Sequence, residues 1–184
     1  AMLRMQEDGL LQLPPPRNGN NNGKPYSRRT QKTDPKPPVV LSPTAFSALT
    51  VEPIQDNNQS HLWNEYIQRY HYLGYAPIPG DQIRYIARFQ DQEVALLSFR
   101  AAVWKTAPRD QFIGWAHPKR KENLHLIINN ARFLILPWVQ TPNLASRILS
   151  MTTKRVSQDW ERLYQYTPVL IETFVEIRRF RGTC

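Results

Sequence analysis

The sequence contains one cysteine, Cys184, among 184 residues, and it has no long apolar run. A single cysteine excludes a disulfide within this sequence and a zinc site built from several thiolates, and it is typical of a reducing compartment. The longest apolar run, residues 133–139, is far shorter than the roughly 20 residues that a membrane-spanning helix needs. The N-terminus also lacks the pattern of a secretory signal peptide. We therefore expect a cytoplasmic protein that does not associate with a membrane.

Acidic residues are also few, since 15 Asp and Glu stand against 24 Lys and Arg, for a formal net charge of +9. Such a balance attracts polyanions, and we expect nucleic acid as a partner. Short basic stretches recur in the second half of the chain, at Lys119, Arg120, Lys121, Lys154, Arg155, Arg178, Arg179 and Arg181. These residues are predicted to bind nucleic acid, with Trp104, Trp115 and Tyr164 as aromatic surface for unpaired bases. A solvated basic surface explains the same residues equally well.

The first 48 residues differ in composition from the rest of the chain. Residues 1–13 are predicted to be the end of a truncated N-terminal helical region, with Gly9 as a C-terminal stop. Residues 14–48 combine many prolines with an asparagine-rich tract and basic residues, a composition that cannot bury a core. We expect a basic linker here, disordered or extended, followed by an α/β domain over 49–184 that is C-terminally incomplete.

Predicted strands alternate with predicted helices from residue 49 onward. Strand-like patterns cover residues 49–54, 82–89, 93–104, 133–139 and 168–177, of which the second and third form a hairpin. Helical spacing covers residues 58–73 and 142–164, and Thr141 is the predicted cap of the later helix, with Pro142 at its first position. Residues 122–131 fit either a helix or a strand, and the helix is favoured.

The last two strands and the helix between them are predicted to form a right-handed crossover, in which the strands lie side by side and the helix covers one face. Together with the upstream hairpin, this crossover predicts an α/β (α+β) fold. It consists of a mixed sheet with flanking helices.

Glu172 is the best single candidate for acid or base chemistry. It interrupts the otherwise apolar strand PVLIETFVEI (168–177), and a carboxylate there must be paired or face a cleft, because burying it alone is costly. A structural ion pair with Arg132 or Arg84 is the alternative.

Two further side chains are candidate catalytic groups. His71 lies near the end of a predicted helix among aromatic residues, where an imidazole can act as a base or simply pack. Asp110 follows Arg109, and a local ion pair that orders a loop is the alternative to catalysis. The spacing of the carboxylates and histidines matches no metal motif, so no metal site is predicted.

Several segments that together cover almost the whole chain resemble the DruA family of the Druantia anti-phage defence systems. They are GLLQLPPPR (9–17), WNEYIQRYHYLGY (63–75), GDQIRY (80–85), RDQFIGW (109–115), RFLILPWVQTPNLAS (132–146), DWERLYQYTPVLIETFVE (159–176) and RFRGTC (179–184). The resemblance implies a component of a prokaryotic defence system with other subunits of that system as partners. Within such an assembly, we expect a module that binds nucleic acid or a partner protein.

The predicted order of elements also resembles the N-acetyltransferase fold of the GCN-related superfamily. In that fold the turn after the fourth strand offers backbone amides to the pyrophosphate of acetyl-CoA, which places Asn143, Leu144, Ala145 and Ser146 at the candidate cofactor site. This turn lacks the usual glycines, and Pro142 removes one amide donor, so a plain helix start is favoured and no cofactor is expected. An acyltransferase that uses acetyl-CoA, or a transposase-like protein that processes nucleic acid, is the alternative function.

Overall fold

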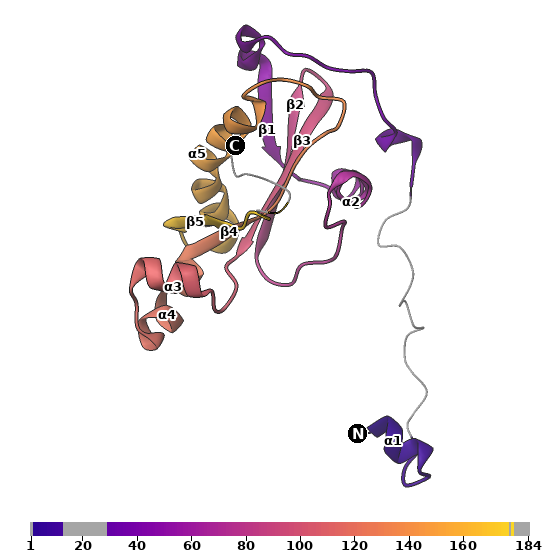
Figure 1. Ribbon diagram of the computed structural model, residues 1–184, viewed down its shortest axis with the longest axis vertical. Helices are drawn as coiled ribbons and strands as arrows, with labels where there is room; N and C mark the ends of the chain where they lie inside the picture. Colours follow the sequence, from indigo (N-terminus) through magenta and orange to yellow (C-terminus); the bar gives the residue numbers. More distant parts are fainter. Residues whose placement is uncertain (1, 13–28, 177, 179–184) are drawn as a thin grey trace.

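A five-stranded mixed sheet with the strand order β1-β2-β3-β4-β5 forms the centre of the domain. The computed structural model describes residues 2–12, 29–176 and 178 (Figure 1). The strands are β1 (Leu49–Pro53), β2 (Gln82–Phe89), β3 (Gln92–Ala101), β4 (Ile127–Ile135) and β5 (Leu170–Thr173). Strands β1 to β4 pair antiparallel, and β5 runs parallel to β4. The predicted mixed sheet with flanking helices is therefore confirmed.

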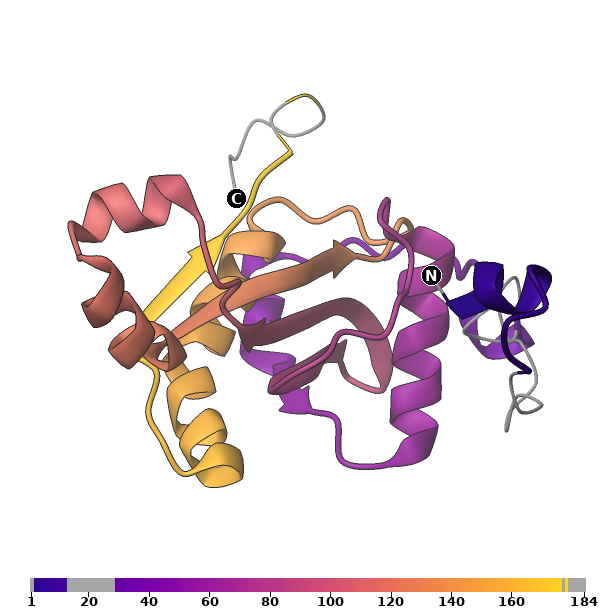
Figure 2. The same cartoon turned by 90° about the horizontal axis from the view of Figure 1, so that it is seen from below.

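Helices α2 (Asn57–Tyr70) and α5 (Leu144–Tyr164) cover opposite faces of this sheet (Figures 1 and 2). Successive side chains of a strand point to opposite faces, and two neighbours on β2 show which helix covers which face. Arg84 donates a hydrogen bond to Asn64 of α2 at 2.8 Å, whereas Tyr85 donates one to Asp159 of α5 at 2.9 Å. We call these two sides the α2 face and the α5 face.

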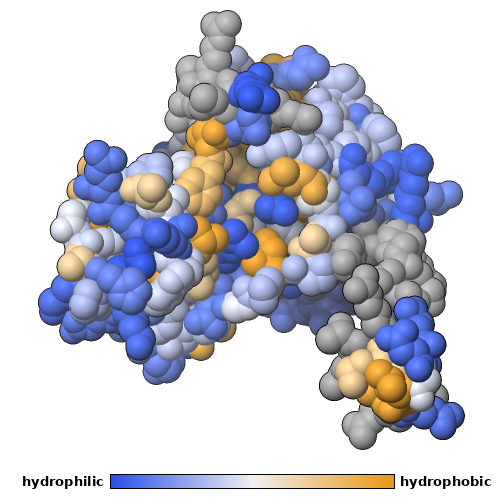
Figure 3. Space-filling model, turned by 60° about the horizontal axis from the view of Figure 1, so that its bottom comes forward, coloured by the Kyte–Doolittle hydropathy of each residue, from blue (hydrophilic) through white to orange (hydrophobic). Residues whose placement is uncertain are grey.

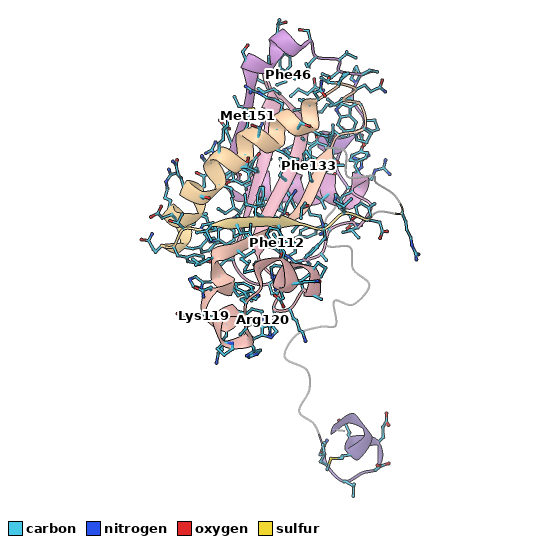
Figure 4. The ribbon with its side chains drawn as sticks, turned by 60° about the vertical axis from the view of Figure 1, so that its left-hand side comes forward. Phe46, Phe112, Lys119, Arg120, Phe133 and Met151 are labelled. Carbon is cyan, nitrogen blue, oxygen red and sulfur yellow. The ribbon has the colours of Figure 1, made fainter. Side chains whose placement is uncertain are left out.

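The apolar core fills both sides of the sheet because the two helices contribute large buried side chains. On α2, Trp63, Tyr66 and Ile67 are buried, and on α5, Ile148 and Trp160 are buried. Figure 4 shows α5 lying across its face of the sheet, with Met151 on the helix and Phe133 on β4. Burial of one stripe of each helix thus holds both of them against the strands.

The predicted crossover is present as β4, α5 and β5, but its boundaries differ from those predicted. Residues 122–131 were favoured as a helix, and this was wrong for most of them. They contain the last residues of α4 (His117–Asn123), the turn η3 (Leu124–Leu126) and the first half of β4. Strand β4 pairs on both edges and is buried at three successive residues from Ile127, so it lacks the alternation that identifies a half-buried strand.

The predicted cap of α5 was also wrong. The helix begins at Leu144, and the hydroxyl of Thr141 accepts a hydrogen bond from the backbone N–H of Leu41 at 2.9 Å. Asn143 precedes the helix in the left-handed conformation, with φ 61° and ψ 3°. The side chain of Thr141 therefore joins α5 to an earlier segment of the chain.

Residues 29–48, which fall within the predicted linker, contact the domain. This segment contains the short helices η1 (Gln31–Thr33) and η2 (Pro43–Ala48), and both Thr33 and Leu41 are buried. The hydroxyls of Thr30 and Thr33 donate hydrogen bonds to the carboxylate of Glu65 on α2, at 2.9 and 2.5 Å. Burial alone would raise the pKa of Glu65, but these hydrogen bonds and the charge of Arg69 lower it.

Two further helical regions complete the described chain. Helix α1 (Met2–Glu7) is followed by Gly9 at φ 68°, and the backbone N–H of Leu10 donates to the carbonyl of Met5, as expected where glycine ends a helix. Helices α3 (Ala107–Ile113) and α4 form a lobe beside β4 and β5 (Figure 1). Residues 14–28 of the predicted linker, and residue 13 of the predicted helical region before it, lie outside the described residues.

Candidate nucleic-acid interface on the sheet

The strand register gathers a set of polar side chains on the α2 face of β3, β4 and β5. Arg84, which contacts α2, lies opposite Ser98, and Ser98 lies opposite Arg132. Arg100 lies opposite Asn129, which in turn lies opposite Glu172 of β5. Residues directly opposite each other in a sheet share a face. We define the sheet-face cluster as Ser98, Arg100, Asn129 and Arg132.

A β-bulge explains how this cluster is assembled. Asn129 and Arg132 are three residues apart, so a regular strand would place them on opposite faces. The register shifts between Ser98 and Phe99, and Ala131 becomes the extra residue of β4. An extra residue of this kind re-aims the side chains that follow it. Both polar residues therefore reach the same face.

The two arginines of the cluster carry charge that no described carboxylate neutralises. Arg100 and Arg132 are half-buried, and no ion pair joins either one to an Asp or Glu among the described residues. Burial and the charge of Arg100 together lower the pKa of Arg132. Two half-buried like charges oppose each other, and an anion placed between them relieves both the repulsion and the desolvation.

The other two members of the cluster hold polar atoms without hydrogen bonds. Ser98 is 1% exposed and Asn129 is 2% exposed, and neither the Ser98 hydroxyl nor the Asn129 Nδ2 has a partner among the described residues. The Nε of Arg100 is also buried and has no hydrogen-bond partner among the described residues. Buried polar atoms are normally hydrogen-bonded, so these three unpaired donors depart from the usual pattern.

His71, a predicted catalytic residue, lies at the border of the cluster. Burial, together with the charge of Arg132, lowers the pKa of His71 to about 4, so the imidazole is neutral at pH 7. Its Nδ1 accepts a hydrogen bond from the backbone N–H of Leu73 at 3.2 Å, and its ring stacks on Tyr72 with a centroid distance of 4.7 Å. The structure thus brings His71 beside a cation, and its catalytic role stays a prediction.

Glu172 forms an ion pair with Arg109 of α3, at 3.2 Å between Oε1 and Nη1. The two side chains are 10% and 4% exposed, respectively. Arg109 also donates to the carbonyls of Val103 and Trp104, at 3.0 and 3.4 Å. Glu172 therefore forms an ion pair, as the alternative prediction stated. Its partner is Arg109, and neither Arg132 nor Arg84. Its assignment as a base stays a prediction.

Asp110 orders the lobe of α3 and α4. Its carboxylate accepts hydrogen bonds from Trp115 Nε1 at 2.9 Å, from Arg120 Nη1 at 2.8 Å and from Arg109 Nε at 3.3 Å. Although burial opposes ionisation, the hydrogen bonds from Trp115 and Arg120 and the charges of both arginines lower the pKa of Asp110. These contacts match the local ion pair considered from the sequence, and a catalytic role for Asp110 also stays a prediction.

The predicted basic residues are distributed over α4, α5 and the segment after β5. Arg120 is buried and pairs with Asp110, and Arg155 pairs with Asp159 at 2.7 Å. Figure 4 shows Lys119 and Arg120 on α4, at the opposite end of the domain from Phe46. Lys119 pairs with Glu122 at 3.0 Å, while Lys121, Lys154 and Arg178 are exposed. Arg179 and Arg181 lie outside the described residues.

Trp104 follows β3 and presents an exposed ring beyond Arg100. The residue is 52% exposed. The guanidinium of Arg120 lies over its ring, 5.5 Å from the centroid, and the His117 ring forms a T-shaped pair with it at a centroid distance of 6.1 Å. These two contacts restrict the orientation of the indole.

The four predicted cofactor residues lie together at the start of α5. Asn143 adopts the left-handed conformation that glycine usually provides, so this turn forms without a glycine. The side chain of Leu144 is buried in the core, which leaves its backbone for any ligand contact. The first amides of a helix, here including those of Ala145 and Ser146, have no acceptor within the helix. Their use by a cofactor stays a prediction.

Most of the sheet-face cluster was not predicted from the sequence, and Arg132 was considered only as an ion-pair partner for Glu172. A signal was present, because Ser98 and Arg100 interrupt an apolar strand, as does the Asn-Asn pair at 129–130. Among the described residues, no group of three or more His, Cys, Asp or Glu side chains lies close enough together to hold a metal ion. None of the helices in the described part of the chain combines the length and apolarity required to cross a membrane.

Comparison with known proteins identifies the family. The family model described as Druantia protein DruA matches residues 5–184. Searches of curated proteins and of solved structures found no match, so the likeness to N-acetyltransferases stays a prediction. The chain therefore belongs to the DruA family, and this membership implies a component of a Druantia anti-phage defence system.

Proposed function

We propose that this domain binds nucleic acid through the sheet-face cluster and serves as a binding module of the defence system. The observation that carries the proposal is the pair of half-buried guanidiniums, Arg100 and Arg132, with no carboxylate partner among the described residues. Arginine forms bidentate hydrogen bonds to phosphate oxygens, and these are stronger than hydrogen bonds between neutral groups.

The charge of the whole chain supports the same proposal. The formal net charge is +9, and many described carboxylates are already paired with Arg or Lys. The cationic excess attracts nucleic acid from solution, while the cluster provides a defined place for its phosphates. We also propose that the module works beside other subunits of the system, as membership of the family suggests.

The test compares two double variants that remove the same charge. Wild type, the Arg100→Gln/Arg132→Gln variant and the Lys32→Gln/Arg147→Gln variant are titrated against fluorescently labelled DNA and RNA. Loss of one charged hydrogen bond weakens binding by about tenfold or more, so the cluster variant should lose at least that much affinity. Lys32 and Arg147 are exposed and lie outside the predicted basic stretches, so their variant reports general electrostatics. Equal losses in both variants would assign binding to overall charge and contradict the proposed site.

An acyltransferase that uses acetyl-CoA is a second candidate, favoured by the backbone of Asn143. Its left-handed conformation produces a tight turn between a strand and a helix, and the free amides of α5 follow it directly. A ligand that binds only the folded protein stabilises it by about 2.7 kcal/mol at a concentration of 100 Kd. Acetyl-CoA should therefore raise the melting temperature if this candidate is correct, and an unchanged melting temperature at millimolar coenzyme would reject it.

A further inference from the structure

We infer that the sheet-face cluster takes a single strand of nucleic acid, whose phosphates contact Arg100 and Arg132 while an unpaired base stacks on Trp104. This inference rests on the proposed nucleic-acid binding and specifies which form of nucleic acid the site selects. It joins two features that lie close together in the chain. These are the half-buried cations of β3 and β4 and the exposed indole just beyond the end of β3.

The partial burial of the two guanidiniums favours a flexible ligand. Arg100 and Arg132 are half-buried, so only part of each side chain is accessible. Duplex DNA is stiff, with a persistence length of about 50 nm, and its backbone cannot adjust at single phosphates. A single strand can change its backbone torsions residue by residue and can bring a phosphate to each partly buried guanidinium.

The spacing of the site suits a short run of nucleotides. Strand rise and spacing place the Cα atoms of Arg100 and Arg132 roughly 8 Å apart, because Ser98 lies two residues from Arg100 and directly opposite Arg132. Trp104 follows Arg100 by four residues, so its Cα lies at most about 14 Å away. Phosphate contacts and a stacked base can therefore belong to the same bound strand.

The indole of Trp104 is exposed and has a restricted orientation, and both properties favour stacking of a base. It is 52% exposed, and the contacts with Arg120 and His117 fix its orientation before any ligand arrives. Every base has an aromatic face that can stack on such a ring, whereas the faces of paired bases within a duplex are already covered by their neighbours. An aromatic ring combined with nearby cations is the arrangement by which proteins bind single strands without reading their sequence.

Exposed apolar side chains occur in the segments beside the cluster. Leu73 follows the His71–Tyr72 pair, and Phe174 and Val175 follow β5, and all three are exposed. Figure 3 shows hydrophobic residues gathered between hydrophilic ones in the middle of the surface that it displays. Apolar surface next to cations suits the unpaired bases of a single strand better than the uniformly charged outside of a duplex.

The experiment titrates the protein with three labelled DNA ligands. They are a thymidine homopolymer, a duplex hairpin with the same number of phosphates, and a homopolymer in which every base is replaced by an abasic deoxyribose. We expect the homopolymer to bind at least tenfold more tightly than the hairpin. Loss of one stacked base weakens binding by roughly 5- to 150-fold, so the abasic strand should lose about that factor against wild-type protein.

Variants of the protein test the proposed stacking of a base on Trp104 by changing the side chain in place of the ligand. Trp104→Ala should weaken binding of the homopolymer by roughly 5- to 150-fold and leave hairpin binding within about twofold. Trp104→Phe keeps an aromatic ring and should retain most of the affinity. Leu163→Ala, which removes an exposed apolar side chain from α5, is the control and should change neither affinity. The abasic ligand makes the test independent of any effect of these substitutions on folding.

The outcomes separate this inference from the function on which it rests. If the hairpin binds as tightly as the homopolymer, or if neither the abasic strand nor Trp104→Ala loses affinity, the single-strand inference is overturned. In that case, sensitivity to Arg100→Gln/Arg132→Gln still supports nucleic-acid binding. If none of the three ligands binds, the proposed function is rejected, and the inference is rejected with it.

Discussion

Removal of the Glu172 carboxylate should destabilise the domain, because it leaves Arg109 buried beside β5 without its main counterion. The two side chains are 10% and 4% exposed and lie 3.2 Å apart. Breaking a buried ion pair by removing one partner costs about 3–5 kcal/mol. Asp110 stays 3.3 Å from the Nε of Arg109, so we expect the lower end of that range, about 3 kcal/mol, for Glu172→Leu.

Urea unfolding, followed by tryptophan fluorescence, measures this loss. For a chain of this size, about 3 kcal/mol corresponds to a decrease in Tm of roughly 6–12 °C. A double-mutant cycle with Arg109→Leu should give a coupling energy of at least about 1 kcal/mol, since the two residues contact each other directly. A loss below about 1 kcal/mol for Glu172→Leu would refute the argument, because it would show a pair as weak as those on protein surfaces.

Substitutions at three further positions test other parts of the structure. The pKa of Glu65 is lowered in the fold, so its carboxylate stabilises the domain above the usual pKa of a glutamate, and this effect is lost as the pH falls below that value to the lowered pKa of the folded state. Glu65→Gln should therefore lower stability at pH 7 and weaken the acid sensitivity of unfolding below the usual pKa of a glutamate, measured by urea titration at each pH. Since the pKa of His71 is lowered to about 4, protonation favours the unfolded chain as the pH falls from about 6.5 to about 4. His71→Asn should remove roughly 2 kcal/mol of that pH dependence, and an unchanged pH profile would show that His71 is not buried beside Arg132. Asn143→Val should cost about 1–2 kcal/mol because of the left-handed backbone, whereas Asn143→Gly should be nearly neutral; equal Tm values for the two variants would contradict the turn geometry.

The crossover of β4, α5 and β5 was predictable because its parts have strong local patterns. Helix α5 carries Leu144, Ile148 and Trp160 on one buried side, and a parallel pair of strands needs a connection of this length. The start of β4 was not predictable from pattern. Its first residues are buried on both faces, so Ile127 and Ile128 follow each other as they would in a buried helix.

The composition of residues 29–48 did not indicate that this segment packs against the domain. Proline and polar residues dominate this segment, and only a few side chains, such as Thr33 and Leu41, enter the domain. Their partners lie far along the chain, since Thr33 contacts Glu65 and Leu41 contacts Thr141. Contacts between residues so far apart in the sequence cannot be predicted from local sequence patterns.

The sheet-face cluster was not predictable for a related reason. Strand register and the bulge at Ala131 bring Ser98 and Arg100 beside Asn129 and Arg132, and neither the register nor the bulge can be determined from local sequence. The basic stretches were easier to see in the sequence. Yet Arg120 forms an ion pair with Asp110, so a residue of a basic stretch can stabilise the fold and need not contact a ligand.

The salt dependence of binding tests the central claim most directly. Each phosphate contact on a single strand contributes about 0.7 to the slope of log K against log salt, so two contacts contribute about 1.4. The measurement compares this slope for wild type and Arg100→Gln/Arg132→Gln, with a thymidine homopolymer between 50 and 200 mM salt, the interval over which such contacts have large effects. Our account predicts that the slope of the variant is shallower by about 1.4, and equal slopes with equal affinities would contradict it.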